Sequence, residues 1–234
     1  MSPGPEIDLP GLGQGIGTLL SLHRAHIRRH VRSFAKSVGF PRWIADMGSG
    51  NSPYRSYFSS DHYVSIDLFA QADVRADICA IPVGDEEMDL VICTEVLEHV
   101  PYPRLALRNI WRVLKPGAHL ILGVPLVWGV HDRVDYYRWT EKGLTQLLET
   151  SQFEILELQR RGGLFSCIGC LVSQIPYQHF GPLAGIRNPL RAYLFAALWC
   201  ALIPIPWLLA PLDCLDRRRD ITLGYDVLAS KRLQ

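Results

Sequence analysis

The residues best suited to bind a small ligand are two glycines and two acids that close two expected strands. Asp46 ends an apolar run that begins at Trp43, and Gly48 and Gly50 form a turn directly after it. Glycine suits this turn because it has no Cβ, so the backbone can bend sharply and approach a ligand closely. Asp67 follows Gly50 by 17 residues and ends the next expected strand. A carboxylate there can accept hydrogen bonds from both hydroxyls of a ribose, so the pattern predicts a nucleoside-binding site.

Charge and spacing favour one kind of nucleoside. A dinucleotide-binding turn reads GxGxxG, and its third glycine would fall at position 53, which is Pro53. Asp46, two residues before the first glycine, would repel a pyrophosphate. S-adenosylmethionine (SAM) carries an ammonium and a sulfonium but no phosphate. The sequence therefore favours SAM over a nicotinamide dinucleotide.

The elements that must position these residues alternate between strand and helix. This alternation predicts an α/β fold with a doubly wound, mostly parallel sheet. A helix is also expected directly after the glycine turn. Lys115-Pro116-Gly117 should end one helix, and Thr140 can cap another. We expect strands at 43–47, 62–66, 74–78, 88–93, 119–124, 153–158 and 221–229, and helices at 18–38, 104–114 and 140–150.

Several blocks resemble the class I SAM-dependent methyltransferases, particularly the type 11 group. The resemblance covers 43–158 and the final strand, and Ser52 stands where relatives often have a glycine. It implies a Rossmann-like, seven-stranded sheet with an antiparallel last strand. The blocks that carry it are Asp46-Met47-Gly48-Ser49-Gly50, Ile66-Asp67-Leu68, Ala76-Asp77-Ile78, 89–100 and 114–120.

The resemblance also implies roles for single residues. Those assigned to the cofactor are Asp46, Gly48, Ser49, Gly50, Asp67, Leu68, Asp77, Ile78, Thr94, Glu95 and His99. The first four would hold the methionine part of SAM, and Asp67 its ribose. Asp77 and Ile78 would contact the adenine, and Thr94 and Glu95 would line the floor near the methyl group. An ordinary turn role is the alternative for Asp77.

Glu95, Glu98 and His99 are spaced by three and four residues, so on one helical turn they would be neighbours. Two carboxylates and an imidazole could bind a divalent cation. Helix capping and hydrogen bonding beneath the cofactor are the alternative. We favour this alternative and predict no metal.

A second polar cluster follows the strand expected at 119–124. It should lie at the carboxyl edge of the sheet, where ligands sit in such folds. His131 is the candidate base because the unperturbed pKa of histidine lies near neutrality, and Asp132 and Tyr136 are candidate catalytic residues beside it. The alternative is that this block only pins its loop and starts the next helix.

Residues 162–220 form an insert before the last strand. Within it, 192–212 contains no charged residue and is long enough to span a membrane. Three prolines argue against one straight helix, and a single crossing would separate the last strand from its sheet. We therefore expect a bent, in-plane or re-entrant element, with arginines on both flanks of 187–219 facing anionic headgroups. A lid or a dimer interface is the alternative.

The 234 residues suffice for one large domain. We expect a flexible arm at 1–17, a SAM-binding domain at 18–161 and 221–234, and a helical insert at 162–220. The net charge of +1 argues against nucleic-acid binding. Six cysteines, mostly in apolar runs, suggest reduced, buried thiols, and the start of the chain does not resemble a signal peptide. We expect a cytoplasmic protein in peripheral contact with the cytoplasmic face of a membrane.

These observations predict a SAM-dependent methyltransferase that acts on an oxygen of a hydrophobic or lipid-linked small molecule. Two rival functions remain. A nicotinamide-dependent oxidoreductase is disfavoured by Asp46 and Pro53. A non-catalytic SAM-binding or membrane-scaffold module would bind the cofactor without transferring its methyl group.

Overall fold

A computed structural model of the chain describes residues 21–69, 71–130, 134–180, 188–218 and 220–233. The described residues form two units. The larger unit comprises 26–162 and 220–233, and the smaller one 21–25 and 163–218. The arm expected at 1–17 lies outside the described residues, as do the candidate residues His131 and Asp132.

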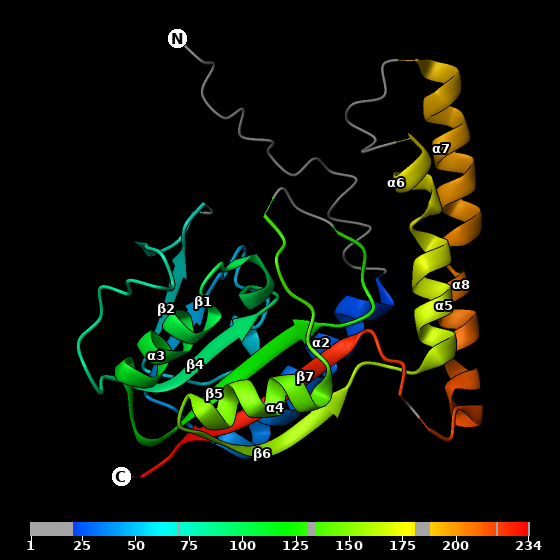
Figure 1. The fold of residues 1–234 in the computed structure, drawn as a ribbon. Helices are drawn as coiled ribbons and strands as arrows, with labels where there is room; N and C mark the ends of the chain where they lie inside the picture. The colour runs from blue at the N-terminus through cyan, green and yellow to red at the C-terminus, as the bar shows by residue number, and fades with distance from the viewer. Residues whose placement is uncertain (1–20, 70, 131–133, 181–187, 219, 234) are drawn as a thin grey trace. The chain divides into compact units, whose positions relative to one another are not determined.

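The larger unit is built on a seven-stranded sheet (Figure 1). Its strands are β1 (Trp43–Met47), β2 (His62–Asp67), β3 (Val74–Arg75), β4 (Met88–Thr94), β5 (Leu114–Pro125), β6 (Phe153–Arg160) and β7 (Gly224–Lys231). The spatial order is β3-β2-β1-β4-β5-β7-β6. Strands β1 to β5 pair in parallel, and β7 is antiparallel to both neighbours. This arrangement confirms the predicted fold, and its strand order reverses between β1 and β4, where such sheets bind ligands.

Helices cover both faces of this sheet. Ile27, Val31 and Phe34 are spaced by three or four residues, so they share one side of a helix that packs into the core on one face. On the opposite face, Leu107 and Leu144 belong to a second, larger core. The helices are α2 (Leu22–Val38), α3 (Pro103–Val113) and α4 (Glu141–Thr150), with 3-10 turns η1 (Arg55–Tyr57) and η2 (Leu97–His99).

Two expectations near the glycine turn are wrong. No α-helix follows the turn; the described chain makes only η1 before β2 begins at His62. Ser52 has a φ of 48° and Tyr54 is buried, so the segment turns inward and leaves too few residues for a helix. The strand expected at 74–78 stops at Arg75, because the Asp77 carboxylate accepts a hydrogen bond from the Cys79 backbone N–H and bends the chain.

Other boundaries also shift. β5 begins at Leu114, directly after α3, and includes Gly117 with a φ of 74°. α3 thus ends just before Lys115-Pro116-Gly117, as predicted, and these three residues form an irregular start of the strand, which pairs with β4 on both sides of a register shift. The last strand starts at Gly224. Thr140 caps α4 as predicted, its Oγ1 accepting from the Gly143 N–H at 3.2 Å.

The smaller unit is a helical hairpin (Figure 1). Its elements are α5 (Leu164–Ser173), α6 (Ile175–Phe180), α7 (Pro189–Leu202), α8 (Ile205–Leu209) and the 3-10 turn η4 (Ala210–Leu215). α5 packs against α8, and α6 packs against α7. The apolar run thus breaks between α7 and α8, as its prolines predict. Buried thiols were the wrong expectation for Cys200 and Cys214, which are exposed on this hairpin.

Candidate cofactor-binding site

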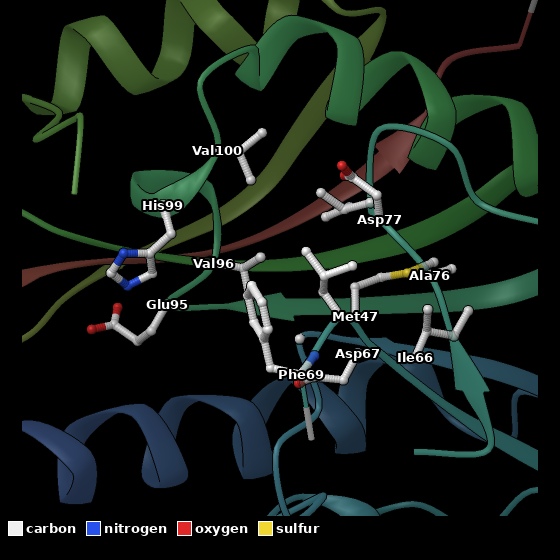
Figure 2. Close-up of a pocket in the computed structure, with 13 residues that line it drawn as sticks. Met47, Ile66, Asp67, Phe69, Ala76, Asp77, Glu95, Val96, His99 and Val100 are labelled. Atoms are coloured by element: carbon white, nitrogen blue, oxygen red, sulfur yellow. The ribbon is translucent and has the colours of Figure 1, made fainter. Parts of the chain in front are cut away.

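A pocket lies where the carboxyl ends of β1, β2 and β4 meet (Figure 2). Seven of the residues that the sequence assigned to the cofactor line it, namely Gly48, Asp67, Leu68, Asp77, Ile78, Glu95 and His99. The remaining lining residues are Met47, Ile66, Phe69, Ala76, Val96 and Val100. The site is therefore assembled from the loops after three neighbouring strands, as the topology of the sheet requires.

The glycine turn is held close to the end of β2. The Gly48 and Ser49 backbone N–H groups both donate to the Ile66 carbonyl, at 2.8 and 3.3 Å. Gly48 has a φ of 63°, and a Cβ added there would lie 2.2 Å from Cγ2 of Val96. Only glycine fits this position. The Ser49 hydroxyl, in the same turn, is buried and has no hydrogen-bond partner among the described residues.

Asp67 links the glycine turn after β1 to the loop after β2. Its Oδ2 accepts from the Gly50 N–H at 3.0 Å, and its Oδ1 accepts from the Phe69 N–H at 2.8 Å. These two backbone bonds fix the carboxylate at the end of β2, where Asp67 lines the pocket.

Asp46 is not among the residues that line this pocket. Side chains alternate along β1, so Met47 reaches the pocket and Asp46 points to the opposite face. There it is 2% exposed and accepts a 2.7 Å hydrogen bond from the Tyr63 hydroxyl. Burial raises the pKa of Asp46 to about 6 against the effect of that hydrogen bond, and the charge of Asp67 adds to the rise. The two acids therefore interact although only one lines the pocket.

The part of the pocket lined by Ala76, Asp77 and Ile78 is apolar apart from one acid. Ile78 is buried at 7% exposure, and Asp77 lines the pocket while also holding the turn at Cys79. The two roles considered for Asp77 are therefore compatible. Phe69 also lines the pocket with 86% of its surface exposed. This ring was not predicted from the sequence, although its position two residues after Asp67 could have indicated it.

Ser49, Gly50 and Thr94, like Asp46, do not line the pocket. Gly50 instead donates its backbone N–H to the Asp67 carboxylate. The Thr94 hydroxyl donates to the Tyr54 hydroxyl at 3.2 Å. These residues lie next to the pocket without lining it.

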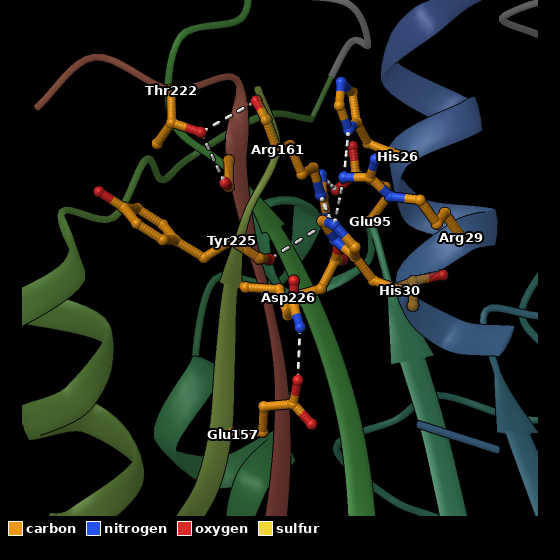
Figure 3. Close-up of polar contacts among 12 residues, drawn as sticks. His26, Arg29, His30, Glu95, Glu157, Arg161, Thr222, Tyr225 and Asp226 are labelled. Carbon is orange, nitrogen blue, oxygen red and sulfur yellow. Dashed lines mark hydrogen bonds and ion pairs between the residues drawn. The ribbon is translucent and has the colours of Figure 1, made fainter. Parts of the chain in front are cut away.

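Glu95 is held by a buried arginine (Figure 3). Arg161 is fully buried, and its Nη1 donates to Glu95 Oε1 at 2.6 Å while its Nη2 donates to Asp226 Oδ1 at 2.6 Å. His30 Nδ1 lies 2.8 Å from the other oxygen of Asp226. Burial alone would lower the pKa of Arg161, but the charges of Asp226 and Glu95 raise it above its ordinary value. This network was not predicted, because no local spacing connects its members.

Glu98 is fully buried beside the pocket. Neither of its carboxylate oxygens has a hydrogen-bond partner in the described part of the chain. Burial raises the pKa of Glu98 to about 8, and the charge of Glu95 contributes to the rise. His99 Nε2 lies 3.7 Å from Glu98 Oε1, and its Nδ1 is 2.6 Å from the Val134 carbonyl.

These side chains do not form a metal site. Glu98 and His99 belong to the 3-10 turn η2, and Glu95 precedes it with a φ of 56°. They are therefore not on one α-helical turn. Among the described residues, no group of three or more His, Cys, Asp or Glu could hold a metal ion.

The segment that follows the gap at 131–133 runs along η2. The Tyr136 N–H donates to the Glu98 carbonyl at 2.7 Å, while the Tyr136 ring is 54% exposed and does not line the pocket. Arg138 pairs with Asp135 and donates to the Gly129 carbonyl at 3.0 Å. These contacts pin the loop, which was the alternative considered for this block.

Comparison with known proteins agrees with this fold. Residues 45–122 match a family described as a methyltransferase domain. No curated protein matches the chain. Three solved structures are similar to this chain in fold. The cyclase SpnF is 19% identical with a TM-score of 0.56, covering 91% of this chain and 82% of its own. A Bacillus halodurans putative methyltransferase is 16% identical with a TM-score of 0.54, covering 88% and 98%.

The third is a Burkholderia thailandensis 1,6-didemethyltoxoflavin-N1-methyltransferase, solved with its substrate and S-adenosylhomocysteine. It is 16% identical with a TM-score of 0.55, covering 98% of this chain and 94% of its own. At these identities, the likeness shows a shared fold. The family match is confined to 45–122, and over most of the chain the fold is one that solved methyltransferases share.

Proposed function

We propose that the protein transfers the methyl group of SAM to an oxygen of a hydrophobic, lipid-linked small molecule at the cytoplasmic face of a membrane. The observation that carries the cofactor part is the charge of the pocket. Of the described residues that line it, Asp67, Asp77 and Glu95 are acids and none is lysine or arginine. A pyrophosphate would be repelled there, whereas the cationic groups of SAM would be attracted.

Each end of the pocket suits one part of SAM. Asp67 would accept from the ribose hydroxyls, and Ile78 with Asp77 would hold the adenine. The backbone of Gly48 and the free Ser49 hydroxyl would meet the methionine part, and Glu95 would border the methyl group. When bound, SAM supplies an electrophilic methyl carbon on its sulfonium. The carbon–sulfur bond breaks as the carbon–oxygen bond forms, and the acceptor hydroxyl loses its proton to a base.

His131 is the proposed base, with Asp132 and Tyr136 beside it. The contacts of the neighbouring described residues support this proposal. His99 Nδ1 lies 2.6 Å from the Val134 carbonyl, and His99 itself lines the pocket. The chain next to 131–133 therefore lies along the pocket wall, where a base can reach a bound acceptor.

The apolar insert supports a membrane-bound acceptor. Pro189–Leu215 is long and apolar enough to cross a membrane, with a mean hydropathy of 1.9, and 11% of its most apolar stretch is buried. A core helix of a soluble protein would be mostly buried. We therefore propose membrane contact through 187–219, where arginines on both flanks suit anionic headgroups.

Calorimetry with SAM and with NAD tests the cofactor. We expect SAM to bind and NAD not to bind. Asp67→Asn should weaken SAM binding about 10- to 100-fold, because charge-assisted hydrogen bonds contribute about 1.5–3 kcal/mol. Asp61→Asn, which alters an exposed acid paired with Arg42, should leave SAM affinity unchanged. Binding of NAD in place of SAM would overturn the proposal.

Mass spectrometry tests the acceptor. The protein is incubated with isotopically labelled SAM and separate lipid and aqueous fractions of a cell extract. We expect the heavy methyl group on an oxygen of a lipid-fraction product. A labelled product confined to the aqueous fraction would contradict the lipid-linked acceptor. SAM binding with no labelled product in either fraction would favour the non-catalytic module.

A further inference from the structure

The two arms of the hairpin at 163–216 are almost free of charge. Between Arg161 and Asp213, the sequence contains only two residues of the Lys, Arg, Asp and Glu types, Arg187 and Arg191. Arg191 is exposed in the first turns of α7, at the end of the hairpin remote from η4. In the described hairpin, these charged residues are thus confined to the start of α7, which we call the tip, and to 213–216, which we call the base.

The inside of the hairpin is packed through small residues. A Cβ added to Gly169 on α5 would lie 2.6 Å from Cα of Pro206 on α8, so the two helices approach closely. Nearer the tip, Tyr177 contacts Phe195 edge to face, with ring centroids 5.3 Å apart. Cys167 is 2% exposed in the same interior. Helices in lipid associate through close packing of this kind.

The outside of the hairpin is apolar. Adjacent residues on α7 and α8 are exposed together, including Tyr193 with Leu194, and Trp207 with Leu208 at 71%. Adjacent residues point about 100° apart around a helix. The exposed surface is therefore not a narrow stripe. An in-plane amphipathic helix needs a charged face opposite its apolar one, and 192–212 has no charged residue to form it.

The base of the hairpin is closed by hydrogen bonds. Asp213 accepts from the Gly163 N–H at 2.7 Å and from the Ser166 hydroxyl, and Asp216 accepts from the Leu164 N–H at 3.0 Å. These acids satisfy the first N–H groups of α5. Just outside the hairpin, the Arg161 N–H donates to the Gly224 carbonyl at 3.0 Å. Both chain ends therefore leave the hairpin on the same side.

The length of the uncharged arm matches a bilayer. Residues 192–212 at a helical rise of 1.5 Å would extend over about 32 Å, against about 30 Å for the hydrocarbon core. The other described arm, 164–180, would extend over about 26 Å at the same rise, and of the described helices Pro189–Leu215 alone is long and apolar enough to cross by itself. A pair of crossings also returns the chain to the side on which it entered, so β7 can pair with β5 and β6.

We propose that the two described arms of the hairpin, 164–180 and 189–215, insert into an anionic lipid bilayer as two helical crossings. The base of the hairpin stays on the catalytic side, and Arg191 reaches the headgroups of the opposite leaflet. This inference deepens the membrane contact of the proposed function, and it makes no use of methyl transfer. A water-exposed lid, a dimer interface and an in-plane helix are the outcomes that the test must separate from it.

The native thiols allow the first test. Cys200 lies within α7 and Cys214 at the base, and both are exposed. The full chain is reconstituted into phosphatidylethanolamine–phosphatidylglycerol vesicles and treated with a membrane-impermeant maleimide. Peptide mass spectrometry should show Cys214 labelled and Cys200 protected at least tenfold until detergent is added. Equal labelling would overturn insertion, and protection that persists without lipid would indicate a protein interface.

The tip is tested with Leu190→Cys. We expect this thiol to react with maleimide trapped inside the vesicles and not with external reagent. Labelling from outside would show that the hairpin lies in the plane of the membrane, which contradicts two crossings.

A matched pair of charges gives a third test. Cys200→Glu places a charge in the middle of the arm and should reduce partitioning into vesicles about 100-fold. Cys214→Glu makes the same change at the base and should have little effect. Equal partitioning of the two variants would overturn the proposal. SAM calorimetry on each variant reports the fold of the larger unit. Insertion without SAM binding would reject the proposed function and leave the hairpin standing.

Discussion

Asp46→Asn should make the ligand-free protein more stable at neutral pH. Asp46 is 2% exposed, and its pKa rises from 3.8 to about 6, mainly because burial penalises the charged form. One pKa unit corresponds to about 1.36 kcal/mol, so ionised Asp46 costs the fold about 3 kcal/mol. Asparagine has the same shape and can still accept from the Tyr63 hydroxyl. The variant should recover up to about 3 kcal/mol of unfolding free energy.

The difference in unfolding free energy between the variant and the wild type should depend on pH. Since the pKa of Asp46 is higher in the folded state, its neutral form contributes full stability below pH 3.8, and this stability is lost as pH rises through about 6. The variant and the wild type should therefore differ little at pH 4 and most at pH 8. Urea unfolding of the full chain in mild detergent, followed by tryptophan fluorescence at both values, measures the difference.

The same substitution should weaken the cofactor site. The charges of Asp46 and Asp67 repel each other, and a cationic ligand in the pocket would attract the charge of Asp46 through the strand as well as that of Asp67. We expect wild-type affinity for SAM to rise with pH through about 6. Asp46→Asn should bind SAM about tenfold less tightly at pH 8 and lose this part of the pH dependence.

Two results would refute this reasoning. A variant less stable than the wild type at pH 8 would mean that the hydrogen bonds of the charged form outweigh its burial. A variant with unchanged SAM affinity would mean that the carboxylate does not act on the ligand at all. Asp61→Asn serves as the control in both assays, because Asp61 is exposed and its charge is paired at the surface.

Two further predictions each compare one substitution with the same substitution at a nearby residue. Arg161→Met should lower the unfolding free energy by about 3–5 kcal/mol, because it leaves buried carboxylates unpaired, whereas Arg160→Met removes an exposed pair and should cost less than about 1 kcal/mol; equal losses in urea titrations would contradict the buried network. Gly48→Ala should abolish measurable SAM binding in calorimetry, because its Cβ would lie 2.2 Å from Val96. In Gly50→Ala the new Cβ meets no atom within 4 Å, so this variant should lose only about 1 kcal/mol of unfolding free energy, from its left-handed backbone. Comparable SAM binding by the two variants would count against a tight glycine turn.

Local chemistry made much of the fold readable from the sequence. Apolar runs identify the strands, and the glycine turn with Asp67 identifies the end of the sheet where the pocket lies. The resemblance to class I methyltransferases implied the antiparallel last strand, and the residue type of Thr140 predicted the capped start of α4. These features depend on residues close together in the chain, so periodicity and turn chemistry are enough to reveal them.

Local boundaries were less readable, because tertiary contacts decide them. The segment after Ser52 turns inward to bury Tyr54, where a helix was expected. Asp46 and Met47 are adjacent, yet the pleat of β1 sends only Met47 to the pocket. Residue type alone could not show which of the two would touch a ligand.

The sequence by itself determined three features of the candidate chemistry: a glycine turn, an acid expected to bind a ribose, and an apolar insert. Only the tertiary structure decided how Glu95 is held, because Arg161 lies 66 residues away and His30 is 196 residues from Asp226. Pairing of β7 with its neighbours brings these buried charges together. Likewise, hydropathy marks the insert, but the close packing of Gly169 against Pro206 makes it a hairpin. Contacts between distant segments carry no local periodicity, so only the folded chain reveals them.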